Sequence, residues 1–116
     1  KRQPRIRYIE MDSLEPDTLT FIKNGLQKDA KVIVNLDSDH HCENVLAELK
    51  AYSDFVSVGS YLIVEDMRIG YVHSKHGRGP DAAVETFLGE DKRFVVEEKW
   101  NDQRSLNFGG YLRRIN

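Results

Sequence analysis

Short apolar runs alternate with segments of helical periodicity along this chain, and two of the runs stop abruptly at acidic residues. The runs with the β-branched and aliphatic content of strands are residues 5–10, 31–36 and 60–64. Runs of this length and composition are typical of strands buried on both faces of a parallel sheet. The second run ends at Asp37, and the third ends at Glu65 and Asp66.

The segments between these runs have the spacing of amphipathic helices. Helices are predicted over residues 16–28, 44–52 and 80–88, and the first begins with a proline, which the first turn of a helix tolerates. Residues 67–79 are predicted to form a loop, and residues 93–97 and 106–108 a closing antiparallel pair. Regular alternation of strand and helix predicts an α/β fold with a mostly parallel sheet and right-handed crossovers.

The acidic residues at the strand ends are the candidate site. Ligands of open α/β sheets bind just beyond the carboxyl ends of the strands. We therefore expect Asp37, Asp39, Glu65 and Asp66 to lie together at that edge. The alternative is that these acids are solvated and cap the helices that follow.

Composition narrows the range of partners. The chain has 116 residues, 40% of them apolar and 31% charged, with a net charge of −2, which favours a single globular domain over residues 1–116. Acids and bases are interspersed, which argues against nucleic acid or a membrane surface as a partner. No apolar stretch reaches the roughly 18 residues of a transmembrane helix. The lone Cys42 excludes an internal disulfide and fits a reducing compartment such as the cytoplasm.

An ordered set of segments resembles the cephalosporin hydroxylase family over nearly the whole chain. The segments are 36–40 (LDSDH), 45–49 (VLAEL) with Tyr52, 56–57, 59–66 (GSYLIVED), 79–80 and 110–114 (GYLRR). That family is similar to S-adenosylmethionine-dependent methyltransferases related to catechol and macrolide-sugar O-methyltransferases. The resemblance implies a partial Rossmann-like methyltransferase fold in which this chain is the C-terminal part of the domain.

The same resemblance shows which part of a methyltransferase domain is absent here. Such a domain begins with a strand and a glycine-rich turn that holds the cofactor, and no glycine-rich turn follows the first apolar run of this chain. Residues 5–13 resemble the family's third strand and the acidic turn after it, with Met11 where the family commonly has glycine. The glycine-rich N-terminal half is therefore missing, and we expect this chain to bind S-adenosylmethionine weakly or not at all.

The resemblance also assigns roles to residues at the strand ends. Asp37, Glu65 and Asp66 match the family's divalent-metal positions, where oxygen ligands suit magnesium. His40 stands where related catechol-type enzymes place a general base, a task that suits an imidazole. The alternative for His40 is an ordinary histidine at the start of a helix.

Three further residues are expected on the cofactor side. The acidic turn at Asp12 and Ser13, together with Asp39, is expected to meet S-adenosylmethionine. Asp12 and Ser13 also fit an ordinary helix start. A competing pattern, in which His41 and Glu43 join a distal His73 or His76, would bind iron as non-haem oxygenases do. Those oxygenases usually carry the motif on a β-barrel, and the α/β pattern disfavours this hypothesis.

The implied parent activity is magnesium-assisted O-methylation of a small hydroxylated acceptor, such as a sugar, an antibiotic or another secondary metabolite. The 116-residue chain is expected to be inactive alone. The alternative is a non-catalytic module that self-associates or binds a partner. The missing strands would leave the edge of residues 31–36 bare, so we expect either residues 5–10 to pair beside it or a homo-oligomer to form through it.

Two smaller expectations concern loops. Residues 67–79 are basic and histidine-rich, as an acceptor-side lid would be, and are alternatively an ordinary mobile loop. Trp100 is expected in a hairpin turn, where its large apolar ring would suit an interface.

Overall fold

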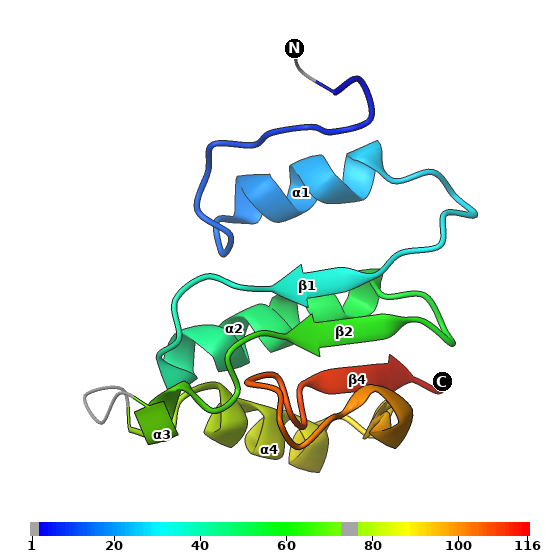
Figure 1. The fold of residues 1–116 in the computed structure, drawn as a ribbon. Coiled ribbons are helices and arrows are strands. Elements are labelled where there is room, and N and C mark those ends of the chain that lie inside the picture. Colours follow the sequence, from blue (N-terminus) through cyan, green and yellow to red (C-terminus); the bar gives the residue numbers. More distant parts are fainter. Residues whose placement is uncertain (1–2, 73–76) are drawn as a thin grey trace.

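The computed structural model describes the backbone of residues 3–72 and 77–116, which form a mixed α/β fold with one four-stranded sheet (Figure 1). The helices are α1 (Pro16–Gly25), α2 (Cys42–Tyr52), α3 (Ile69–Val72) and α4 (Pro80–Glu90). The strands are β1 (Val34–Leu36), β2 (Tyr61–Val64), β3 (Phe94–Val96) and β4 (Tyr111–Arg114). Short 3₁₀ turns cover Ser53–Phe55 and Glu98–Trp100, so Trp100 ends a helical turn.

The sheet has the order β1-β2-β4-β3. β1 and β2 are parallel, with Val34 opposite Leu62 and Leu36 opposite Val64. The helix α2 connects them, as the alternating pattern predicts. β4 is antiparallel to both of its neighbours, β2 and β3.

The predicted closing pair is correct for its first strand and wrong for its second. β3 pairs with β4 (residues 111–114), whereas residues 106–108 form a turn. The reason lies at the two glycines that follow. Gly109 has a φ of 87°, and a Cβ on Gly110 would lie 2.2 Å from the backbone oxygen of Val64. The chain therefore turns there and enters the sheet only at Tyr111.

The predicted strand at residues 5–10 is wrong. These residues are described but form no strand, and Tyr8 is 75% exposed. They run beyond α1, on the side of that helix away from β1 (Figure 1). An isolated run of β-forming residues makes no strand without a neighbour to receive its hydrogen bonds. Pairing of this segment beside residues 31–36 is thus also wrong.

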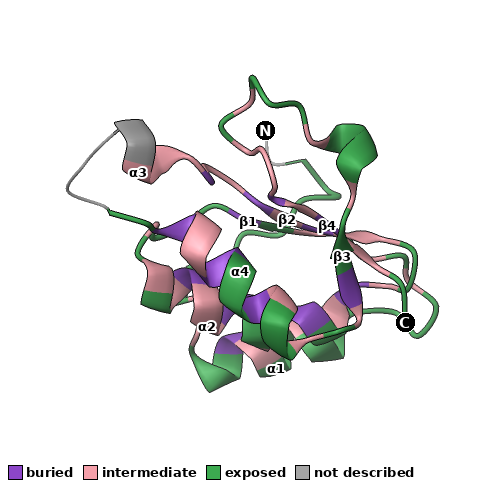
Figure 2. Ribbon diagram, turned by 90° about the horizontal axis from the view of Figure 1, so that it is seen from below, coloured by how far each residue is buried: buried purple, intermediate pink, exposed green. Residues whose placement is uncertain are grey.

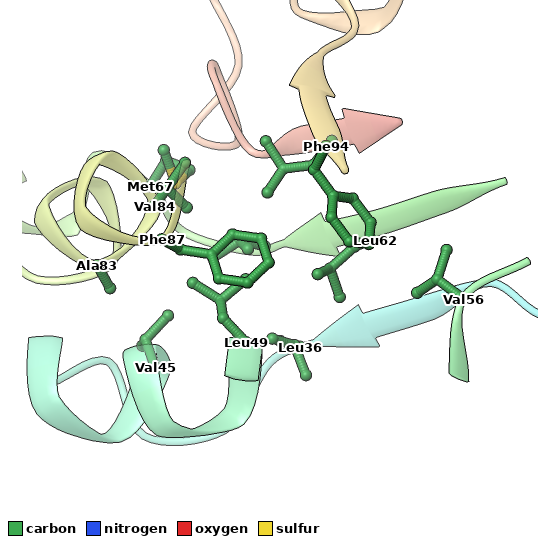
Figure 3. Packing of buried hydrophobic residues seen from close by; sticks show 12 residues of the cluster. Leu36, Val45, Leu49, Val56, Leu62, Met67, Ala83, Val84, Phe87 and Phe94 are labelled. Atoms are coloured by element: carbon green, nitrogen blue, oxygen red, sulfur yellow. The ribbon is translucent and has the colours of Figure 1, made fainter. Parts of the chain in front are cut away.

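The hydrophobic core lies between the sheet and the helices α2 and α4, which pack against each other (Figure 2). Leu62 and Leu112, which are opposite each other on β2 and β4, are fully buried. Leu49 of α2 points toward Leu62 from the helix side (Figure 3). Phe87 of α4 lies with its ring centroid 5.5 Å from that of Phe94. Burial of each such large side chain stabilises the fold by about 1.5–3 kcal/mol.

The helices begin and end close to the predicted positions. α2 begins two residues before its predicted start, and α4 extends two residues beyond its predicted end. α1 ends at Gly25, because Leu26 already has extended backbone with a ψ of 131°. Within the described part of the chain, no helix is both long and apolar enough to cross a membrane.

Part of the expected loop at residues 67–79 is the short helix α3. The described residues leave out 73–76, so that part of the expected lid and the histidines of the iron hypothesis, His73 and His76, lie outside them.

Candidate functional site

The carboxyl ends of β1 and β2 bring one histidine and two aspartates together. Asp37 follows β1 directly, and Asp66 follows β2 after one intervening residue. The Nε2 atom of His40 lies 3.8 Å from Oδ1 of Asp37 and 2.9 Å from Oδ2 of Asp66. One ligand atom from each residue lies within 4.8 Å of the other two. The parallel pairing of β1 with β2 is what places residues so far apart in the sequence at one edge.

His40 is the best enclosed member of this cluster. Its side chain is 23% exposed, against 60% for Asp37. Its Nε2 atom is buried and has no hydrogen-bond partner among the described residues, although Oδ2 of Asp66 lies 2.9 Å away. A buried polar atom that lacks a hydrogen bond is rare and calls for a ligand or a proton-transfer role.

Asp66 has an unusual backbone. Its φ of 52° is in the left-handed region, where a residue other than glycine is uncommon. Its backbone N–H donates to the Oδ1 atom of Asn107 over 2.8 Å, which holds the turn. Strained backbone of this kind persists where the surrounding contacts over-determine it, and it clusters at functional sites.

Glu65 precedes Asp66 in the chain, but its carboxylate interacts with Asn107 and not with the cluster of Asp37, His40 and Asp66. Its Oε2 atom accepts a hydrogen bond from the side-chain amide of Asn107. Among the described residues, the gathered donor atoms are those of Asp37, His40 and Asp66, without Glu65. Asn107 was missed by the sequence reasoning, since nothing local marks it.

The expected cofactor-side residues lie on two segments joined by a buried acid. Ser13 donates through Oγ to Oε1 of Glu48 over 2.5 Å, and Ser38 donates to the same oxygen over 2.7 Å. Glu48 is 2% exposed. It therefore ties the turn at Ser13 to the loop that carries His40. The sequence marks Glu48 as unusual, because this acid lies on the apolar helix face that contains Val45 and Leu49.

Asp12 and Asp39 keep their carboxylates at the surface. Oδ1 of Asp12 accepts a hydrogen bond of 2.8 Å from the backbone of Leu14. Asp39 accepts one of 2.8 Å from the backbone N–H of His41, and its carboxylate also contacts the His41 ring. The hydrogen bond from the backbone N–H of His41 has the largest effect, followed by the contact with the His41 ring, and together they hold the pKa of Asp39 below its usual range. Asp39 therefore remains ionised near neutrality.

An open cavity of about 520 Å³ adjoins the Asp66 turn and is lined by Met67, Arg68, Asp81 and Phe108. The guanidinium carbon of Arg68 lies 4.6 Å from the centroid of the Phe108 ring. The backbone N–H of Arg68 donates to the carbonyl of Leu106 over 3.1 Å, so the two walls are joined. The size suits a small molecule, and the walls combine an aromatic ring with charged groups.

Comparison with known proteins identifies relatives of this chain. Residues 1–115 match the rhamnosyl O-methyltransferase/CmcI family. The chain belongs to this family. It is similar to a rhamnosyl O-methyltransferase of Mycobacterium tuberculosis (strain ATCC 25618 / H37Rv), with 35% identity over 114 residues, or 94% of this chain and 44% of the relative. It is also similar to a rhamnosyl O-methyltransferase of Mycobacterium leprae (strain TN), with 36% identity over 107 residues, or 84% of this chain and 46% of the relative.

This member of the rhamnosyl O-methyltransferase/CmcI family thus spans less than half the length of these curated relatives. No solved structure matches the chain. The family membership confirms the likeness to the cephalosporin hydroxylase family that the sequence motifs indicate. Membership of an O-methyltransferase family implies S-adenosylmethionine as the methyl donor.

The chemistry of the family's site can be tested against the residues present. One carboxylate oxygen of Asp37 and one of Asp66 lie within 4.8 Å of each other, and carboxylate oxygens suit a hard divalent cation. The residues at the strand ends therefore fit a metal. The fit to S-adenosylmethionine is partial, because Asp12 and Asp39 offer exposed acceptors while the hydroxyl of Ser13 is already bonded to Glu48.

Proposed function

We propose that this chain carries the metal-side and acceptor-side part of an O-methyltransferase site that acts on a sugar hydroxyl. The observation that carries the proposal is the cluster of Asp37, His40 and Asp66 at the carboxyl ends of β1 and β2, in a chain of this family. Residues 1–116 would be the C-terminal part of a Rossmann-like methyltransferase domain. The acceptor class follows from the rhamnosyl O-methyltransferases among the relatives.

Asp37, Glu65 and Asp66 would hold Mg²⁺ in this proposal. When bound, such an ion lowers the pKa of an acceptor hydroxyl and orients its oxygen. The contact of Glu65 with Asn107 engages only Oε2, and a carboxylate has a second oxygen to offer. The hard oxygen set of three carboxylates is the one that magnesium prefers.

His40 would act as the general base. Its Nε2 atom takes the proton of the acceptor hydroxyl, and the acceptor oxygen is left with the electron pair that forms the new bond to carbon. S-adenosylmethionine would supply the methyl group, its sulfur–methyl bond breaking so that the sulfur leaves as a neutral thioether. The carboxylates of Asp37 and Asp66, 3.8 and 2.9 Å from Nε2, stabilise the imidazolium that results.

Asp12, Ser13 and Asp39 would face the cofactor. Glu48 bonds both Ser13 and Ser38, so the cofactor side and the base side of the site are linked through one buried carboxylate. This link would keep the distance and orientation between the methyl donor and the base constant. Correct relative position is a main requirement for transfer between two bound molecules.

A second candidate function is that of a self-associating or partner-binding module without catalysis. The exposed edge of β1 favours it, since β1 pairs only with β2 among residues 3–72 and 77–116, and Ile33, just before the strand, is 60% exposed. An unpaired edge is a template for another chain.

The metal assignment is tested by titrating the chain with MnCl₂ in a calorimeter, with Mn²⁺ as a stand-in for Mg²⁺. We expect weak binding that is lost in Asp37→Ala and in Glu65→Ala. Asp29→Ala is the matched control, because Asp29 is an exposed acid outside the cluster, and its binding isotherm should equal that of the wild type. Equal binding by all four proteins would contradict the assignment.

A further inference from the structure

We infer that Asn107 is the positioning residue of the metal site, because its one side chain holds both acids that follow β2. This inference rests on the proposed function. Its Oδ1 atom accepts the backbone N–H of Asp66 over 2.8 Å, and its Nδ2 group donates to Oε2 of Glu65. Asn107 lies more than forty residues further along the chain, in the turn that precedes β4.

The first of these contacts fixes a backbone that would otherwise relax. Asp66 has a φ of 52°, and a left-handed residue other than glycine needs contacts that compensate its cost. The bond to Oδ1 of Asn107 satisfies the N–H of Asp66 in this conformation. The same conformation brings the Asp66 carboxylate to 2.9 Å from Nε2 of His40.

The second contact orients Glu65. Because the amide of Asn107 donates to Oε2, that oxygen is directed toward the turn, and the carboxylate loses the freedom to rotate. Carboxylates that hold metals are commonly hydrogen-bonded in this way, and loss of such a partner typically weakens metal affinity about 10- to 100-fold. An asparagine can serve both neighbours because its amide offers a donor and an acceptor.

Asn107 is itself held firmly, as a positioning residue has to be. Its backbone N–H donates to Oγ of Ser105 over 3.0 Å, and its carbonyl accepts from the N–H of Gly110 over 2.8 Å. The carbonyl of Gly110 accepts in turn from the N–H of Val64, over 2.8 Å. The turn is thus attached to β2 immediately before the two acids, so the amide approaches them in one fixed orientation.

The experiment compares Asn107→Ala with Asn101→Ala. Asn101 holds the same loop, since its Oδ1 atom accepts from the backbone of Gly109 over 2.8 Å, but among the described residues it has no hydrogen bond to either acid. Binding of Mn²⁺ is followed by the electron paramagnetic resonance of the free ion. Amide hydrogen exchange at Asp66 is measured by NMR on the metal-free protein.

In Asn107→Ala we expect the Mn²⁺ dissociation constant to rise about 10-fold or more and the Asp66 amide to exchange faster. In Asn101→Ala the dissociation constant and the exchange rate should both stay within about threefold of the wild type. If Asn107 only stabilised the loop, the two variants would instead be affected alike. Wild-type affinity in Asn107→Ala, or an equal loss in both variants, would overturn the inference and leave the proposed function standing. Absence of Mn²⁺ binding by the wild-type protein would overturn the metal part of the proposed function and this inference with it.

Discussion

At the scale of single residues, buried polar side chains do most to define the candidate site. Glu48 and the Nε2 atom of His40 are buried from solvent. The side-chain amide of Asn107 donates a hydrogen bond to Glu65. A buried polar group is costly without a hydrogen bond, so such residues specify one arrangement of the loops around them.

Glu48 gives a residue-scale prediction. We expect Glu48→Ala to destabilise the protein by about 1–3 kcal/mol, because Ser13 and Ser38 lose their shared acceptor. Glu48→Gln keeps a carbonyl oxygen for the two hydroxyls, so it should cost clearly less. Urea unfolding followed by circular dichroism measures both changes. Equal losses in the two variants would show that the hydroxyl bonds are unimportant.

At the scale of elements, the turn before β4 is decided by close approach of two backbones. Gly110 lies against β2 so closely that a Cβ would meet the Val64 oxygen at 2.2 Å and Cγ of Met67 at 2.8 Å. Backbone that is this close to a neighbouring strand cannot move away without breaking the bond from Val64 to Gly110. Only glycine therefore fits there.

This crowding gives an element-scale prediction with an internal control. We expect Gly110→Ala to lower the free energy of unfolding by about 1–3 kcal/mol, because β4 has to shift away from β2. Gly89 in α4 has nothing within 4 Å of an added Cβ, so Gly89→Ala should raise it by about 0.5–1 kcal/mol through helix propensity. Thermal unfolding of the two variants compares them directly. The same sign of change in both would contradict the crowding argument.

At the scale of the whole molecule, the sheet is open on one side. β1 is at the end of the order β1-β2-β4-β3, and residues 5–10 do not cover it. Several apolar side chains at this end are exposed, including Phe21 and Ile33 at 50% and 60%. Exposed apolar surface beside a free strand edge is typical of a contact surface.

We therefore predict that the chain forms a homodimer through the β1 edge. Sedimentation velocity should show a concentration-dependent shift toward the dimer, and Ile33→Lys should abolish it, because a charge at this edge opposes pairing. Lys92→Glu, an exposed change at the other end of the molecule beyond α4, is the control and should leave the shift unchanged. A wild-type chain that stays monomeric at all concentrations would refute the prediction.

Cofactor binding is also a property of the whole molecule. The chain spans 44% of its relative from Mycobacterium tuberculosis, and no glycine-rich turn that could hold the cofactor follows β1 or β2. We expect S-adenosylmethionine to bind weakly or not at all. Calorimetric titration of the chain measures this, and a dissociation constant in the low micromolar range would contradict it. Such a value would mean that the turn at Asp12 and Ser13 replaces the missing loop.

The amino-acid sequence by itself determined the elements whose pattern is local. The periodicity of Val45, Leu49 and Tyr52 predicted α2, and the apolar run that precedes Glu65 predicted β2. The abrupt change from apolar to acidic residues also located the edge at which Asp37 and Asp66 meet. These features depend on neighbours in the chain, so a one-dimensional pattern contains them.

Only the tertiary structure decided which distant segments meet. The pairing of β3 with residues 111–114, the unpaired state of residues 5–10, and the contact of Asn107 with the two acids after β2 each depend on a partner far along the chain. Strand partners are selected by packing and by the hydrogen bonds that each backbone can complete, and local composition does not record them. The acids were therefore visible in the sequence, whereas the amide that holds two of them was not.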